Sequence, residues 1–121
     1  MMKEILFVML GGGLGTVLRY LVSSCLKTKF NLAHWATFWI NVSGCLALGI
    51  LFKFALGHGH LFHTFVIVGM IGSYTTFSAF EYENIDLIAH EKYFEFLKYS
   101  TFSCAFAFLA VAFGFYCANL I

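Results

Sequence analysis

Residues 69–83 read Gly-Met-Ile-Gly-Ser-Tyr-Thr-Thr-Phe-Ser-Ala-Phe-Glu-Tyr-Glu, a stretch rich in hydroxyl groups inside an otherwise lipid-like sequence. Gly69 and Gly72 carry no Cβ and free the backbone. The Ser and Thr side chains that follow can compete for backbone hydrogen-bonding groups. We therefore predict that a helix breaks between Gly72 and Thr76. Irregular backbone at membrane depth persists only where it is buried in protein or lines a wet cavity, so the predicted break is a candidate site.

The composition is that of a membrane protein. Of 121 residues, 61% are hydrophobic and only 11% are charged, whereas about 25% of a soluble domain is charged. A membrane-spanning helix needs roughly 20 apolar residues. Blocks of that length occupy residues 5–26, 34–56, 61–88 and 94–120. We predict an all-α integral membrane fold with four transmembrane helices, the third broken near its middle, in a single domain over residues 1–121.

The first block carries a run of glycines and a charge. Gly11-Gly12-Gly13 interrupts the apolar run and Arg19 follows inside it, so we favour a mature helix over a signal peptide. Gly11 and Gly15 have the small-xxx-small spacing that brings membrane helices into close contact. Arg19 is costly in lipid. It either snorkels to the interface or lies at the mouth of a wet vestibule, where it would raise the local anion concentration.

Lysines are distributed almost evenly between the two sides of the membrane. An even number of spans places both chain ends on one side, with Lys3 and Lys53. The other side carries Lys27, Lys29, Lys92 and Lys98. This weak positive-inside bias leans toward chain ends outside, and it allows insertion both ways. Two opposite copies could then pair about a two-fold axis in the membrane plane.

Further polar side chains fall inside the other blocks. Asn41 either joins helices by a hydrogen bond or points its NH₂ donors at a dehydrating anion. Tyr99 and Ser103 share a helix face at i, i+4 spacing. These hydroxyls either bond to their own backbone or form a polar track along a pore. Among the carboxylates after the predicted break, Glu83 is the one we consider close enough to take part in function.

The remaining reactive side chains give no sign of an enzyme. The widely spaced cysteines are interpreted as small buried thiols rather than a disulfide or zinc set. They are Cys25, Cys45, Cys104 and Cys117. His58, His60 and His63 are interpreted as part of an interfacial loop rather than a metal site. Neither a nucleophile–base pair nor a nucleotide motif is visible, so we predict a non-enzyme that binds no nucleic acid.

Three patterns together carry a family resemblance. They are Gly11-Gly12-x-x-Gly15-x-x-x-Arg19-Tyr20, Thr37-x-x-x-Asn41-x-x-Gly44-x-x-x-x-Gly49 and Gly69-x-x-Gly72-x-x-Thr75-Thr76-Phe77-Ser78-x-Phe80-x-x-Glu83. In this combination, over nearly the whole chain, the sequence resembles the CrcB/Fluc family of fluoride channels. Departures from the family pattern are Ser73-Tyr74 before the two threonines, Ala36 before Thr37, and Ala107 on the fourth-span track.

The resemblance implies a fluoride-selective channel that exports fluoride passively and lowers its cytoplasmic concentration. It implies an antiparallel, dual-topology homodimer with two pores in the cell membrane, the inner membrane if the cell is Gram-negative. It also implies a structural sodium ion at the dimer interface, held by the backbone carbonyls of Gly72 and Thr75 from both copies.

The resemblance also assigns roles to single side chains. Phe77 and Phe80 correspond to the family's pore phenylalanines, and Asn41 corresponds to its pore asparagine. Arg19 corresponds to the vestibule arginine, and Glu83 to an acid that gates or lines the ion path. Further N–H or O–H donors suited to fluoride are Thr76, Ser78, Tyr99 and Ser103. Without the motif context, plain packing would be the preferred interpretation of the two phenylalanines.

Two other classes of membrane protein remain as alternatives. A small multidrug or cation exporter would also be a four-span, dual-topology dimer. It would need a membrane-embedded carboxylate in the first span, where the only acid is Glu4. A non-transporting membrane subunit would need no helix break. A heterodimer with an oppositely oriented paralogue is also compatible with the weak charge bias.

Overall fold

A computed structural model describes residues 2–28 and 35–120 and contains no strand within these ranges. Its helices are α1 (Met2–Thr28), α2 (Ala36–Gly57), α3 (His60–His63), the π-helical segment η1 (Thr64–Ile71), α4 (Gly72–Tyr74), α5 (Ser78–Ala89) and α6 (Tyr93–Leu120). Lys29 and the first residue of the predicted block 34–56 lie outside the described ranges.

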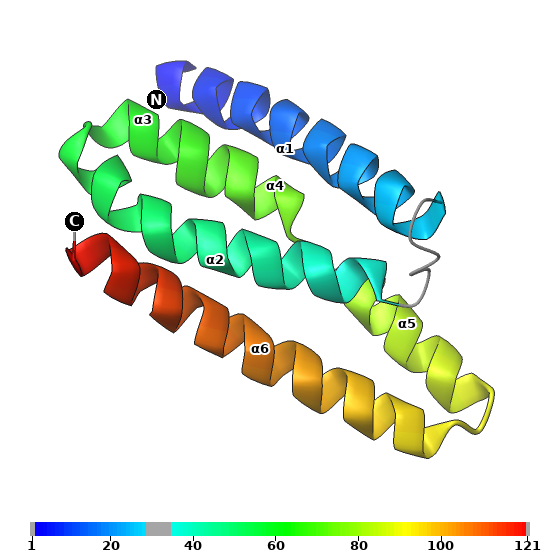
Figure 1. Ribbon diagram of the computed structural model, residues 1–121. Helices are drawn as coiled ribbons and strands as arrows, with labels where there is room; N and C mark the ends of the chain where they lie inside the picture. Colours follow the sequence, from blue (N-terminus) through cyan, green and yellow to red (C-terminus); the bar gives the residue numbers. More distant parts are fainter. Residues whose placement is uncertain (1, 29–34, 121) are drawn as a thin grey trace.

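Four helical segments are long and apolar enough to cross a membrane, as the sequence predicts. They are Met2–Thr28, Ala36–Gly57, His60–Ala89 and Tyr93–Leu120. Figure 1 shows them side by side, with η1 and α4 between α1 and α2, and α6 on the other side of α2. The start of α1 and the end of α6 lie at the same end of the molecule. The short α5 turns away from α4 and runs along α6.

The third spanning segment bends near its middle. Helix continues from His60 through α3, η1 and α4 to Tyr74. Thr75 then adopts an extended backbone, with φ −72° and ψ 155°. Helix resumes at Ser78. The hydroxyl-rich stretch quoted above therefore coincides with the change of direction visible after α4 in Figure 1.

Glycines allow neighbouring helices to pack backbone against backbone. A Cβ added to Gly15 of α1 would lie 2.1 Å from the Met70 carbonyl oxygen of η1. A Cβ on Gly49 of α2 would lie 2.3 Å from the Val111 carbonyl oxygen of α6. Gly11 and Gly15 are both buried. The prediction that these two residues mediate close helix packing is confirmed.

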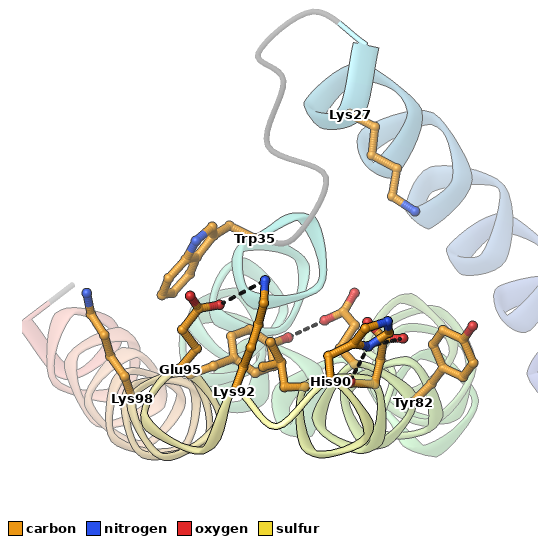
Figure 2. Close-up of a pocket in the computed structure, with 11 residues that line it drawn as sticks. Lys27, Trp35, Tyr82, His90, Lys92, Glu95 and Lys98 are labelled. Carbon is orange, nitrogen blue, oxygen red and sulfur yellow. Dashed lines mark hydrogen bonds and ion pairs between the residues drawn. The ribbon is translucent and has the colours of Figure 1, made fainter.

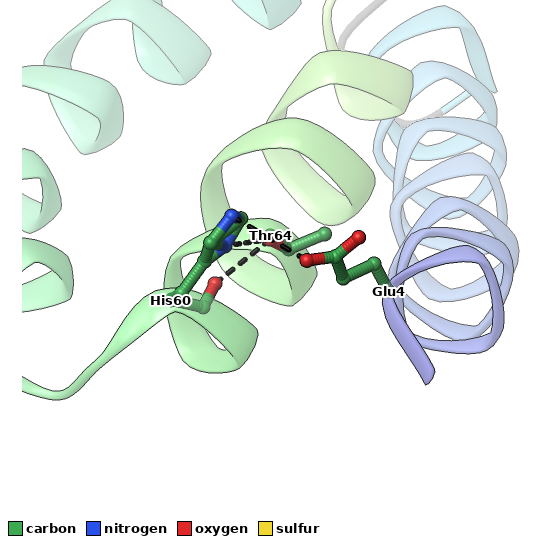
Figure 3. Close-up of polar contacts among 3 residues, drawn as sticks. All are labelled: Glu4, His60 and Thr64. Carbon is green, nitrogen blue, oxygen red and sulfur yellow. Dashed lines mark hydrogen bonds and ion pairs between the residues drawn. The ribbon is translucent and has the colours of Figure 1, made fainter. Parts of the chain in front are cut away.

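The histidines of the second connection are mostly helical, which corrects the prediction of a loop. Gly59, at φ +89°, turns the chain, and α3 starts at the next residue, His60. The Thr64 hydroxyl donates to the His60 carbonyl at 2.7 Å. His60 Nε2 lies 3.6 Å from Glu4 Oε1 on α1 (Figure 3). The described residues contain no group of three side chains suited to holding a metal ion.

The glycine contacts predict opposite effects for one substitution at two nearby positions. Gly15→Ala should destabilise the protein by about 1–3 kcal/mol, because the new methyl group overlaps the η1 backbone. Gly13→Ala meets no atom within 4 Å. It should be neutral or stabilising by about 0.5–1 kcal/mol, because alanine is the better helix former. Thermal unfolding in detergent would measure both, and equal unfolding temperatures would contradict the close packing of α1.

Candidate functional site

The side-chain amide of Asn41 holds the bend. Its Nδ2 donates to the Thr76 carbonyl at 2.9 Å, and its Oδ1 accepts from the Thr76 N–H at 2.8 Å. One turn further along α2, Gly44 lets the bend approach, since a Cβ there would lie 2.3 Å from Thr75 Cγ2. The predicted interhelical hydrogen bond of Asn41 is therefore present, and its partner is the backbone of the bend.

At the bend, two backbone N–H groups bond to side chains instead of to helix carbonyls. In an α-helix each N–H bonds to the carbonyl four residues earlier. The Thr76 N–H goes to Asn41 instead of the Gly72 carbonyl. The Ala79 N–H points to Thr76 Oγ1 at 3.4 Å instead of the Thr75 carbonyl. Gly72 and Thr75 thus retain carbonyl oxygens able to bind a hard cation.

A groove of about 490 Å³ runs beside the bend, and we call it the central groove. Its lining contains Asn41, Gly44, Cys45, Leu48, Ile67, Ile71, Gly72, Thr75, Thr76, Phe77, Phe80, Ser103, Cys104 and Ala107. Ser103 is only 8% exposed, and its hydroxyl has no hydrogen-bond partner among the described residues. A buried hydroxyl without a partner is costly.

The two phenylalanines of the motif occupy different environments. Phe77 is 73% exposed, whereas Phe80 is 8% exposed and packs with Phe38 and Tyr99. The ring centroids of Phe77 and Phe80 are 5.9 Å apart, and those of Phe80 and Tyr99 are 5.6 Å apart. A continuous row of aromatic rings therefore leads from the bend to α6.

Glu83 accepts hydrogen bonds from two other helices. The Thr37 hydroxyl donates to Oε1 at 2.7 Å, and the Tyr99 hydroxyl donates to Oε2. Two hydroxyl donors satisfy both oxygens of an ionised carboxylate. Thr37 was not among the site residues predicted from the sequence. Thr37 lies four residues before Asn41 and therefore on the same helix face, and this spacing was the signal available in the sequence.

Glu83 and Tyr99 also line a second cavity, of about 800 Å³, which we call the end cavity (Figure 2). Its wall includes the charged side chains Lys27, Asp86, His90, Lys92, Glu95 and Lys98. Lys92 Nζ lies 3.8 Å from Glu95 Oε2, and His90 Nδ1 lies 3.5 Å from Asp86 Oδ1. Lys27 and Lys98 have no ion-pair partner within residues 2–28 and 35–120.

Two of the predicted site residues line neither cavity. Arg19 is half-buried on α1, so its vestibule role stays a prediction. Ser78 starts α5, and its hydroxyl lies 3.3 Å from Thr76 Oγ1. In the sequence, Lys27 and Lys98 bear only on membrane topology. In the structure, both line the end cavity without an ion-pair partner among the described residues.

The prediction of four buried thiols is wrong for two of them. Cys25 and Cys104 are exposed, whereas Cys45 and Cys117 are partly exposed. The reason is architectural, because helices arranged side by side leave broad faces that only lipid or another subunit can cover. Cys45 and Cys104 both line the central groove.

Comparison with known proteins identifies the family. Residues 6–115 match the family model described as CrcB-like protein, Camphor Resistance (CrcB). A Rhizobium meliloti protein named Fluoride-specific ion channel FluC is 38% identical over 117 residues, covering 93% of this chain and 94% of that protein. A Flavobacterium psychrophilum protein of the same name is 43% identical over 94 residues, covering 72% of this chain and 73% of that protein. The chain therefore belongs to the CrcB family.

Proposed function

We propose that this protein is a fluoride-selective ion channel that exports fluoride passively and lowers its cytoplasmic concentration. The relatives named above are fluoride-specific ion channels, and channels of this kind are not enzymes. The observation that carries the proposal is the central groove. There Ser103, whose buried hydroxyl has no partner within residues 2–28 and 35–120, shares a wall with Asn41 and Phe80. The protein is a multi-pass integral membrane protein of the cell membrane.

The groove offers what a small, strongly hydrated anion needs when it leaves water. Selectivity in channels depends on pore-lining groups that replace the hydration shell. An asparagine amide has two N–H donors, and Asn41 uses one on the Thr76 carbonyl, leaving the other for fluoride. Ser103 and Thr76 supply O–H donors beside it. Phe77 and Phe80 present ring edges, which are weakly positive and attract the anion without trapping it.

Fluoride reaches the groove through the end cavity. Lys27 and Lys98 attract the anion there, and Ser78 lies beside Thr76 as an additional donor at the bend. Glu83 and Tyr99 both line the end cavity. Phe80 packs on Tyr99 and lines the central groove, so Glu83 and Tyr99 lie between the two cavities. Glu83 acts as a gate when its bonds to Thr37 and Tyr99 open.

The functional unit is an antiparallel homodimer of oppositely inserted copies. The weak lysine bias and the broad apolar faces support this arrangement, since a second copy can cover what one protomer leaves exposed. Carbonyls of Gly72 and Thr75 from both copies hold a sodium ion at the interface. The diverted hydrogen bonds of Thr76 and Ala79 leave these oxygens available. The ion would neutralise the converging carbonyl dipoles and stabilise the paired bends.

Fluoride efflux from liposomes that contain this protein alone tests the proposal. We expect rapid fluoride loss with chloride retained, and loss about tenfold or more slower for Phe80→Ile, which corresponds to a barrier about 1.4 kcal/mol higher. Phe113→Ile is the matched control, because Phe113 is 62% exposed and lines neither cavity. Folded protein that releases no fluoride would refute the self-sufficient homodimer channel.

Asn41→Ala should slow fluoride efflux and raise the sodium concentration that efflux requires. The substitution removes an anion donor and frees the Thr76 N–H to return to the Gly72 carbonyl. Asn119→Ala is the control, since the Asn119 amide donates to the Phe115 carbonyl of its own helix. Efflux would be measured with sodium and with N-methylglucamine on both sides. An unchanged sodium requirement in Asn41→Ala would contradict the link between clamp and cation.

Lys27→Gln and Lys98→Gln should slow fluoride efflux at low ionic strength and have little effect at high ionic strength. Salt screens the attraction between fluoride and unpaired surface cations, because the Debye length is about 10 Å at 0.1 M. Lys3→Gln is the control, because Lys3 is exposed and lines neither cavity. A salt-independent defect would show that these lysines act structurally.

A further inference from the structure

The central groove contains two thiols that the proposed conduction of fluoride does not use. Cys45 lies one helical turn after Asn41 on α2, so the two share a face. Cys104 directly follows Ser103 on α6. Both cysteines line the groove, whereas Cys25 and Cys117 line neither cavity. Two neighbouring helices thus present soft sulfur ligands to one space.

The groove has room for a metal ion bound to these thiols. Its volume is about 490 Å³, far more than one small anion fills. Ser103 lines the groove, and its buried hydroxyl oxygen has no hydrogen-bond partner among the described residues. This hydroxyl is a polar group, independent of the cysteines, whose pairing the described residues leave open.

The surroundings of the thiols select the class of ligand. Leu48, Ile67, Ile71 and Ala107 make most of the nearby wall apolar. Thiolates prefer soft metal ions, whereas hard hydrated cations need several oxygen ligands. Within the part of the chain that the structure describes, no carboxylate lines the groove. A thiophilic ion such as Hg²⁺ or Ag⁺ suits the two thiols.

We propose that Cys45 and Cys104 make the central groove a binding site for soft, thiophilic metal ions, and that occupancy stops anion passage. With mercuric chloride, an S–Hg bond forms while one S–H and one Hg–Cl bond break. A proton and a chloride ion are released, and no electrons are transferred. Cys104 reacts first because it is exposed, whereas Cys45 is partly buried.

Blockage follows from where the metal binds, and this part rests on the proposed function. A metal on either sulfur occupies the groove that Asn41 and Ser103 also line. Fluoride is a hard anion with little affinity for a soft metal–thiolate centre, so the bound metal offers it no replacement for those donors.

The test treats liposomes containing the full chain with mercuric chloride and then measures fluoride efflux. Mass spectrometry of the same sample locates the mercury adduct. Wild type should carry the adduct at Cys104, at Cys45 or at both, and its efflux should fall to the level of protein-free liposomes. Excess dithiothreitol should restore it. The double variant C45A/C104A should resist inhibition, while C25A/C117A should remain as sensitive as wild type. C45S/C104S repeats the test with side chains closer in size to cysteine.

Several results would overturn the proposal. Absence of an adduct on both groove cysteines would exclude the site, and so would inhibition that persists in both groove double variants. An adduct at Cys104 with unchanged efflux would exclude the block. Failure of the proposed function looks different, because untreated wild type would then release no fluoride. The position of the adduct would still decide whether Cys45 and Cys104 bind the metal in preference to Cys25 and Cys117.

Discussion

The paired hydrogen bonds between the Asn41 amide and the backbone of Thr76 are the interaction on which the rest of the site depends. Unpaired backbone groups are unfavourable at membrane depth, so a bend in a spanning segment needs partners from elsewhere. Asn41 satisfies both the N–H and the carbonyl of one residue. The bond from the Thr76 N–H also releases the Gly72 carbonyl, and Asn41 lies in the wall of the central groove.

Helix packing allows this clamp to form. The hydrophobic effect contributes little to helix association in lipid, so association depends on close contact between helices. Gly15 brings α1 against the third segment, and Gly49 brings α2 against α6. Gly44 serves the bend directly, since any larger residue would collide with Thr75. Small residues at these positions set the spacing that places Asn41 within hydrogen-bond distance of Thr76.

Glu83 illustrates how the protein places a charge near the membrane interior. A carboxylate there is unfavourable unless its oxygens are hydrogen-bonded. Hydroxyls from α2 and α6, those of Thr37 and Tyr99, bond to one oxygen each. Hydrogen bonds to a charged group each contribute about 1.5–3 kcal/mol. In the gate that we propose, these neutral donors can rotate away from Glu83 more readily than a fixed lysine or arginine partner would.

The sequence alone determined the class of the protein. Apolar blocks of spanning length require four membrane helices, and the glycines and hydroxyls of residues 69–83 indicate where the third segment changes direction. Local composition is sufficient for these features, because lipid imposes the same demand on every spanning segment. Asn41, Phe80 and Ser103 were likewise identified from sequence, and the structure brings them to one groove.

Only the tertiary structure decided which distant residues meet. The bond from Thr37 to Glu83 joins residues 46 positions apart. The end cavity combines Lys27 with Lys98, and the groove combines Cys45 with Cys104. Hydropathy along the chain does not predict such pairs, because every face of these helices is apolar enough for lipid. Which face a side chain occupies therefore depends on packing between helices, and that is a property of the fold.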